Sequence, residues 1–93
     1  MNVFYTYILT NKLRTVFYTG VTNNLPLRVY QHKYKIAEGF TKKYNVNILI
    51  YFEEYGKIID AIAREKQIKD YRREKKLDLI KGKNPILEEI DVS

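Results

Sequence analysis

The chain has 93 residues, of which 45% are apolar, and this is enough to build the core of one small domain. Seventeen Lys and Arg residues outnumber eleven Asp and Glu residues, and the net charge of +6 favours a polyanionic partner such as a nucleic acid. The absence of cysteine excludes disulfides and thiolate metal sites and is compatible with the cytoplasm. No apolar run reaches the ~20 residues of a membrane span, and we expect no signal peptide either.

The first part of the chain predicts two paired strands. Residues Val3 to Thr10 are rich in β-branched and aromatic side chains, and both faces are apolar, so we expect a central strand covered on both sides. Asn11 to Arg14 is short enough for a hairpin loop, and Val16 to Val21 is the returning strand. Gly20 is expected to end that strand, where the chain turns sharply or approaches another group closely.

A helix and a third strand follow. Asn24 is a suitable N-cap and Pro26 is tolerated in a first helical turn, so we expect a helix that runs to about Lys35. Residues 37–45 read as a loop, and residues 46–52 as a strand. Alternation would place four apolar residues of that strand on one face: Val46, Ile48, Ile50 and Phe52.

The second half of the chain is helical. A long helical pattern begins near Gly56, is broken near Arg72, and continues to Lys81, where Gly82 stops it as a C′ residue. The element order β-β-α-β-α-α predicts a small α/β (α+β) fold with a three-stranded, mainly antiparallel sheet flanked by helices. We expect a single domain over residues 1–85 and a C-terminal tail over residues 86–93.

Polar residues stand where both helices should be apolar. At ~100° per residue, Arg28 and His32 lie on the apolar stripe of the first helix, and Glu65 lies within that of the later one. The two stripes consist of Leu25, Val29 and Ile36, and of Ile58, Ala61, Ile62 and Ile68. Burying an unpaired charge is costly. Either Arg28 and Glu65 form a structural salt bridge, or both helices face a shared cleft in which Glu65 holds a cation and Arg28 and His32 face a phosphate.

Two tyrosines and two basic segments extend this pattern. Tyr7 and Tyr18 come from the paired strands and approach the Gly20 turn, although core packing with the hydroxyl at solvent is the alternative. The segment from Arg64 to Lys76 is either a solvated helix face or a rim that binds a nucleic-acid backbone. In FTKKY, residues 40–44, two lysines stand beside two aromatic rings, a combination suited to phosphate contact and base stacking.

Several of these segments are similar to one known family. YTYIL at residues 5–9, YTG at 18–20 and the following Arg28 and His32 resemble the GIY-YIG nuclease superfamily. YTGVTNNLPLRVYQHK, GFTKKYN and AIAREKQIKDYRREKK resemble its small, single-domain bacterial UPF0213-type branch, and the resemblance spans about Val3 to Pro85. The chain departs from the pattern where GIY is YTY and YIG is YTG. These are scaffold positions, so the expected fold is unaffected.

The resemblance implies an endonuclease that hydrolyses DNA with the help of one Mg²⁺ or Mn²⁺ ion. It matches Tyr7, Tyr18, Arg28 and His32 to the family's two tyrosines and its helix arginine and histidine, and Glu65 to its metal-binding carboxylate. In the resulting hypothesis Tyr7 is the general base and His32 accepts or relays the proton. Arg28 stabilises the developing charge, and Tyr18 orients phosphate or water.

The resemblance does not define which residues contact the nucleic acid or which substrate is cut. The candidate binding residues are Lys33, Lys42, Lys43, Tyr44, Lys69, Arg72, Arg73 and Asn84. DNA is the expected partner, with RNA as an alternative, and branched, damaged and single-stranded substrates of repair or recombination all fit. Two alternatives to the endonuclease remain. One is a non-catalytic nucleic-acid-binding module that kept the fold, and the other is an interaction protein in which Arg28 and Glu65 only form a salt bridge.

Overall fold

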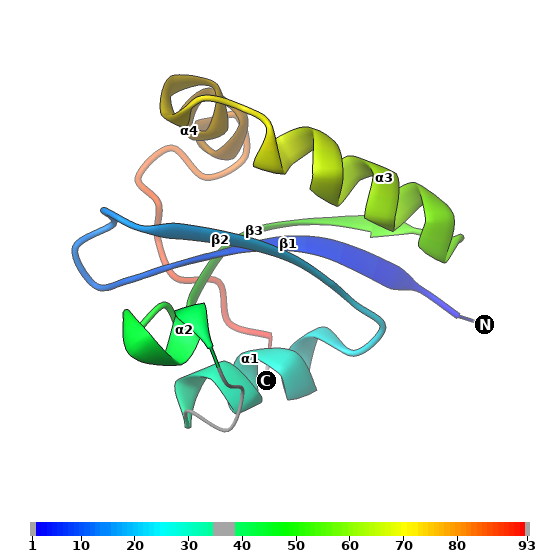
Figure 1. The fold of residues 1–93 in the computed structure, drawn as a ribbon, viewed down its shortest axis with the longest axis horizontal. Coiled ribbons are helices and arrows are strands. Elements are labelled where there is room, and N and C mark those ends of the chain that lie inside the picture. The colour runs from blue at the N-terminus through cyan, green and yellow to red at the C-terminus, as the bar shows by residue number, and fades with distance from the viewer. Residues whose placement is uncertain (1, 35–38, 93) are drawn as a thin grey trace.

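The computed structural model describes residues 2–34 and 39–92, in which a three-stranded sheet has helices on both faces. The strands are β1 (Phe4–Thr10), β2 (Phe17–Thr22) and β3 (Ile48–Tyr55). The helices are α1 (Leu25–Lys33), α2 (Phe40–Lys43), α3 (Ile58–Lys69) and α4 (Arg73–Lys81). The sheet is antiparallel in the order β2-β1-β3, with α1 and α2 on one face and α3 and α4 on the other (Figure 1). The predicted fold class is confirmed, with α2 as an additional helix.

Strand β1 is central and covered on both sides, as its two apolar faces predict. Tyr7 and Leu9 join the core under α1, while Ile8 joins the core under α3 and α4. All three side chains are at most 1% exposed. Burial of each such side chain stabilises the fold by about 1.5–3 kcal/mol. The strand therefore ties together two separate hydrophobic layers.

The hairpin between β1 and β2 forms as predicted, but Gly20 does not end the returning strand. Gly20 lies inside β2, directly opposite Tyr7 of β1. A Cβ atom at this position would lie 2.5 Å from the hydroxyl oxygen of Tyr7. The close approach that the glycine suggested is therefore present, and the expected strand end is wrong.

Helix α1 begins where its capping residues predict. The Asn24 side chain accepts a hydrogen bond from the backbone N–H of Leu27 at 3.2 Å, and Pro26 lies in the first turn. The helix ends at Lys33. The expected end at Lys35 and Ile36 of the expected apolar stripe both lie outside the described part of the chain. Within α1 the buried residues are Leu25, Val29 and His32.

The predicted loop over residues 37–45 contains the single-turn helix α2. Its backbone bonds run from Lys43 to Gly39 and from Tyr44 to Phe40, both at 3.1 Å. Thr41, only 5% exposed, packs inward from this turn. A four-residue helix has too few residues to show a period in the sequence, so tertiary contacts decide its conformation.

The face assignment for the third strand is wrong because β3 contains a bulge. Ile8 pairs with Tyr51 and Leu9 with Leu49, so Ile50 is an extra residue opposite β1. Ile48 and Ile50 consequently pack under α3 and α4, whereas Val46 and Phe52 pack under α1. The strand also starts later than predicted, at Ile48, and continues to Tyr55.

The helical second half breaks near Arg72 as predicted, and two details differ. Gly82 ends α4 with a φ of −61°, so it is not a left-handed C′ residue. In α3 Ala61 and Ile68 are buried, but Ile58 and Ile62 are 51% and 37% exposed, so only part of the expected stripe faces the core. None of the described helices has the length and apolarity that a bilayer crossing requires.

The segment after Pro85 packs along the domain. It leaves α4, passes the sheet and ends beside α1 (Figure 1). Leu87 is buried in the core under α4, and the Ile90 N–H donates to the Leu49 carbonyl at 2.8 Å. Ile90 and Val92 then pack against the core under α1. The tail thus links both hydrophobic layers.

Candidate active site

Tyr7 is the buried centre of a partly buried polar cluster on the α1 face of the sheet. The side chain is 1% exposed, and its ring lies in the space that Gly20 leaves by having no side chain. Its hydroxyl oxygen lies 3.4 Å from Arg28 Nε and 3.4 Å from His32 Nε2. Both partners come from α1, one helical turn apart, which is the spacing that the sequence pattern indicated.

Tyr18 completes this cluster from β2. Its ring centroid lies 6.4 Å from that of Tyr7 and 5.8 Å from that of His32. The structure therefore brings together four of the five predicted site residues. We refer to Tyr7, Tyr18, Arg28 and His32 as the Tyr7 cluster.

His32 is neutral at pH 7. Burial, and then the nearby charge of Arg28, lower its pKa from 6.5 to about 4. Its Nδ1 lies 2.9 Å from Thr41 Oγ1. If Nδ1 donates to Thr41, Nε2 is the acceptor that faces the Tyr7 hydroxyl. Thr41 was not among the predicted site residues. Its position within the GFTKKYN segment was the only indication in the sequence.

The hydroxyl of Tyr7 is protonated at neutral pH. Burial raises its pKa above 10.0, and the hydrogen bond from Arg28 only partly opposes this effect. Arg28 therefore does not turn Tyr7 into a phenolate. For Tyr7 to accept a proton, its own proton must leave, and the nearby Nε2 of His32 is the available acceptor.

Glu65 reaches the cluster region from α3. Its side chain is 20% exposed and pairs with Lys69 Nζ at 3.3 Å. It is close enough that its negative charge contributes to the raised pKa of Tyr7. The buried Arg28–Glu65 bridge, which the sequence left as an alternative, does not form. Arg28 donates to Tyr7 and to the Gln31 side chain instead.

Glu65 has the chemistry of a ligand for one hard cation. Among the described residues, no three or more His, Cys, Asp or Glu side chains gather as a metal site. Mg²⁺ is commonly held by one or two carboxylates together with substrate phosphates and waters. A single carboxylate beside the Tyr7 cluster fits that mode, and does not fit a preformed cage of protein ligands.

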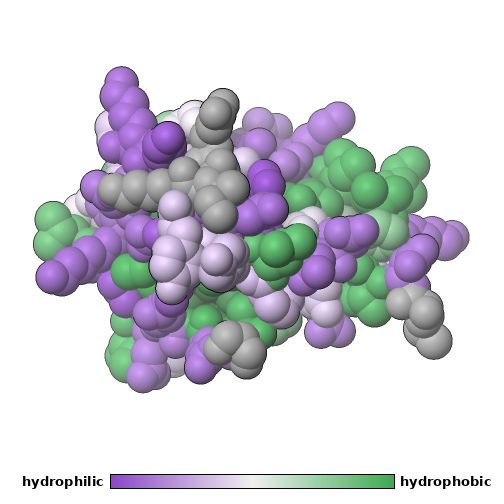
Figure 2. All heavy atoms as spheres, turned by 90° about the horizontal axis from the view of Figure 1, so that it is seen from below, coloured by the Kyte–Doolittle hydropathy of each residue, from purple (hydrophilic) through white to green (hydrophobic). Residues whose placement is uncertain are grey.

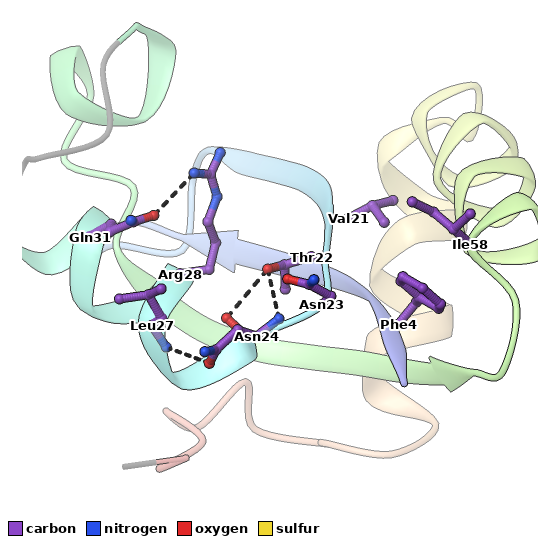
Figure 3. Close-up of a pocket in the computed structure, with 9 residues that line it drawn as sticks. All are labelled: Phe4, Val21, Thr22, Asn23, Asn24, Leu27, Arg28, Gln31 and Ile58. Atoms are coloured by element: carbon purple, nitrogen blue, oxygen red, sulfur yellow. Dashed lines mark hydrogen bonds between the residues drawn. The ribbon is translucent and has the colours of Figure 1, made fainter. Parts of the chain in front are cut away.

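A groove leads to Arg28 from the surface (Figure 3). It encloses about 400 Å³, and its lining residues are Phe4, Val21, Thr22, Asn23, Asn24, Leu27, Arg28, Gln31 and Ile58. Arg28 and Gln31 lie at one end, and Phe4 and Ile58 at the other (Figure 3). Hydrophobic side chains gather at the surface at the N-terminal end of the molecule (Figure 2).

Within the described residues, no carboxylate forms an ion pair with Arg28, so an anion in this groove meets an unneutralised guanidinium.

Three of the predicted nucleic-acid contacts are bound to the protein itself. Lys33 pairs with Glu89 at 2.5 Å. Arg73 donates to the carbonyls of Thr15 and Arg14. The Asn84 side-chain amide donates to the carbonyls of Ile50 and Glu88, so it anchors the tail.

The other predicted contacts are exposed. Lys42, Lys43 and Tyr44 belong to α2 and its C-cap, and the Lys43 ammonium lies over the Tyr44 ring. Lys69 lies between Glu65 and the Tyr18 ring, whose centroid is 6.0 Å from Lys69 Nζ. Arg72 is exposed at the break between α3 and α4. Lys69 is the one among them that touches the Tyr7 cluster.

A second polar network lies on the opposite face of the sheet. Glu53 accepts hydrogen bonds from Arg64 at 2.9 and 3.0 Å and from the hydroxyls of Tyr51 and Tyr55. We refer to these four residues as the Glu53 network. It removes Arg64 from the expected basic rim. The sequence analysis did not predict this network. The indication in the sequence was the alternation of residues 51, 53 and 55 along one strand, which continues beyond the predicted strand end at residue 52.

The comparisons with known proteins agree with the resemblance stated above. Residues 3–78 match the model of the GIY-YIG catalytic domain. A UPF0213 protein of Clostridium perfringens is 38% identical over 80 residues, which cover 86% of this chain and 85% of that protein. A UPF0213 protein of Staphylococcus haemolyticus is 33% identical over 76 residues, with coverage of 82% and 92%.

One solved structure extends the comparison to the fold. The solution NMR structure of a UPF0213 protein from Bacillus halodurans matches with a TM-score of 0.58 and 25% identity. The match covers 90% of this chain and 88% of that one. Sequence, fold and family model agree, and the chain belongs to the GIY-YIG nuclease family, in its small UPF0213-type branch.

Proposed function

We propose that this protein is a divalent-metal-dependent endonuclease that hydrolyses DNA phosphodiester bonds. The observation that supports this most strongly is the hydroxyl of Tyr7, which lies 3.4 Å from both Arg28 Nε and His32 Nε2. In a chain of a nuclease family, a tyrosine hydroxyl beside a cation that no described carboxylate neutralises, at the end of a groove, supports a role in phosphodiester hydrolysis.

Arg28 binds the scissile phosphate in this proposal. Hydrogen bonds to Tyr7 and Gln31 occupy its Nε and Nη1 and fix the plane of the guanidinium. In this proposal Nη2 donates to an oxygen of the phosphate. A fixed cation stabilises the negative charge that develops on the phosphate during attack, without a cost for reorganisation.

Tyr7 and His32 move the proton of the attacking water. The water oxygen forms a bond to phosphorus as its proton passes to the Tyr7 hydroxyl oxygen, and the proton of Tyr7 passes to His32 Nε2. The bond from phosphorus to the leaving oxygen breaks. The neutral state of His32 at pH 7 is the state that this transfer requires. Tyr18, whose ring is beside both, orients the water or the phosphate.

Glu65 would hold the metal ion in this proposal, since a carboxylate is the kind of ligand that a hard cation prefers. A bound Mg²⁺ or Mn²⁺ stabilises charge on the phosphate and the leaving oxygen. Holding the metal would require the Glu65 carboxylate to give up its ion pair with Lys69. Lys69 would then be free to contact the DNA backbone.

A non-catalytic nucleic-acid-binding module is the second candidate. The low pKa of His32 favours it, because an imidazole that protonates near pH 4 is a weak proton acceptor. The ion pair between Lys69 and Glu65 also favours it, since it neutralises the carboxylate that the endonuclease would need for its metal ion.

Nicking of supercoiled plasmid separates the two functions. We expect nicking with Mg²⁺ or Mn²⁺ and none in EDTA. Glu65→Gln should nick about 100-fold more slowly or worse, because several kcal/mol of metal stabilisation is lost. Glu74→Gln, an exposed carboxylate on α4, is the matched control and should keep the full rate. Binding of the plasmid without nicking under every metal condition would select the binding module, and full activity of Glu65→Gln would remove the metal role of Glu65.

A further inference from the structure

A second hollow borders β2 at residues 17–19, whereas the Arg28 groove borders residues 21 and 22 of the same strand. The second hollow encloses about 280 Å³, and its lining residues are Phe17, Tyr18, Thr19, Phe40, Lys69 and Lys76. We call it the aromatic hollow. Its walls come from β2, α2, α3 and α4, so residues far apart in the sequence form one site.

Aromatic rings connect the aromatic hollow with the Tyr7 cluster. The rings of Tyr18 and Phe40 are stacked, with centroids 6.4 Å apart and an angle of 24° between their planes. The Phe40 ring lies 4.8 Å from that of Tyr44. Phe40 is 46% exposed and Tyr44 is 45% exposed, so the series of rings runs from buried His32 to the surface. Aromatic rings at the surface, such as those of Phe40 and Tyr44, are suited to stacking with planar groups, above all nucleobases.

The charges in the hollow match a nucleotide. Lys69 and Lys76 enter from α3 and α4, and Lys69 Nζ lies 6.0 Å from the centre of the Tyr18 ring. Cations beside a stacking platform are the combination by which proteins bind single-stranded nucleic acid. Lys69 already pairs with Glu65, whereas Lys76 forms no ion pair within the described residues, so a phosphate in the hollow would supply Lys76 with a counter-charge.

Both hollows border the same edge strand. The aromatic hollow contacts residues 17–19 of β2, and the Arg28 groove contacts Val21 and Thr22. At ~3.3 Å per residue, Tyr18 and Val21 are about 10 Å apart along the strand. Gly20 and the Tyr7 hydroxyl lie between them. A phosphate at Arg28 would thus have an attached or neighbouring base within reach of Tyr18 and Phe40.

We propose that the aromatic hollow binds an unpaired nucleobase next to the scissile phosphate, so that the substrate is a nucleic acid with single-stranded nucleotides at the cut. The assignment of the cut rests on the proposed function; the binding of an unpaired base does not. Within a duplex, neighbouring base pairs cover both faces of each base, and reaching a stacking platform requires unstacking. A single strand, a loop or a bulge presents these faces directly.

Binding in EDTA tests this without cleavage. Fluorescence anisotropy would compare a labelled 20-nucleotide single strand with its duplex. We expect the single strand to bind more tightly to the wild type, and Phe40→Ala to weaken that binding about tenfold, with little effect on the duplex. Phe40→Tyr should retain affinity and Phe40→Leu should lose it, because leucine keeps apolar volume without a flat face. Leu13→Ala, 78% exposed in the hairpin loop, is the surface control.

Equal binding of single strand and duplex, or wild-type affinity of Phe40→Leu, would overturn the inference. Cleavage assays then distinguish a failure of this inference from a failure of the proposed function. If the single strand binds through Phe40 but no substrate is ever cut, the endonuclease fails and the base site stands. If fully paired DNA is cut as fast as DNA with a central unpaired loop, and Phe40→Ala changes neither rate, the endonuclease stands and the base site fails.

Discussion

Each face of the sheet buries a tyrosine beside an arginine, but the two faces balance the charge of that arginine differently. In the Glu53 network, the carboxylate of Glu53 accepts two hydrogen bonds from Arg64, at 2.9 and 3.0 Å. In the Tyr7 cluster, Arg28 donates to a hydroxyl and an amide, and no described carboxylate pairs with it. The first arrangement contains its own counter-charge, and the second lacks one.

The pKa values follow from this difference. Burial alone would raise the pKa of Glu53, but hydrogen bonds from Arg64, Tyr51 and Tyr55 lower it to about 2. On the other face the charge of Arg28 adds to burial and lowers the pKa of His32 to about 4. Tyrosine and arginine thus form a charge-balanced network on one face, and on the other an arrangement in which no described carboxylate neutralises the arginine. Charge balance, and not the presence of buried polar groups, distinguishes the two.

The largest expected effect is on the open face. Arg28→Ala should lower the plasmid nicking rate about 100- to 1000-fold, because it removes a fixed cation from the developing charge. The free energy of unfolding should fall by only about 1 kcal/mol, because hydrogen bonds to Tyr7 and Gln31 are lost but no ion pair is broken. The rate would be measured per mole of folded protein, with circular dichroism as the check on folding. A rate within threefold of the wild type would contradict the assignment of Arg28.

The matching change on the closed face should affect stability instead. Arg64→Ala leaves the largely buried Glu53 carboxylate without its cation and should lower the free energy of unfolding by about 3 kcal/mol. Urea denaturation measures this, and Lys66→Ala, an exposed change in the same helix, is the control. The nicking rate of the folded protein should be retained. A loss of stability below about 1 kcal/mol would show that the network is not a scaffold.

The two faces should also respond to acid in different pH windows. The unfolded chain protonates His32 near pH 6.5 and the folded protein only near pH 4, so the unfolded state binds more protons in between and stability falls as pH falls. The depressed pKa of Glu53 gives the same sign between about pH 4.5 and 2. Between pH 6.5 and 5.5, His32 should account for about 1 kcal/mol.

Urea titrations across this range would detect the two windows. His32→Gln should remove the loss of stability above pH 4.5, and Glu53→Gln should reduce the loss of stability below that pH. An unchanged slope in His32→Gln between pH 6.5 and 4.5 would mean that His32 is not held neutral by the fold.

The part of the site that follows a local period was predictable from sequence. Arg28 and His32 are one helical turn apart on a stripe with Leu25 and Val29, and any helix that buries this stripe turns both inward. Tyr7 and Tyr18 follow from hairpin pairing, which sets them on adjacent strands of one face. Local spacing determines these relations before any long-range contact forms.

Contacts between distant segments were not predictable. The bulge at Ile50 shifts the faces of β3 without a sequence signal. The bond between His32 and Thr41 depends on a single-turn helix, and that between Glu53 and Arg64 joins a strand to a helix. The sequence could not show that Glu53 forms an ion pair with Arg64. Arg64 was therefore assigned to the basic rim, and Arg28 was considered as a partner for Glu65. Tertiary pairing decided both cases.

One pair of substitutions tests the contrast between the faces most directly. Tyr7 and Tyr51 are both buried, at 1% and 2% exposure, and each loses one hydroxyl on substitution by phenylalanine. Tyr7→Phe should nick plasmid about 100-fold more slowly, because the proton carrier is gone. Tyr51→Phe should keep the nicking rate and lose about 1 kcal/mol of stability with its hydrogen bond to Glu53. A full rate in Tyr7→Phe, or an equal loss of rate in both variants, would contradict the account.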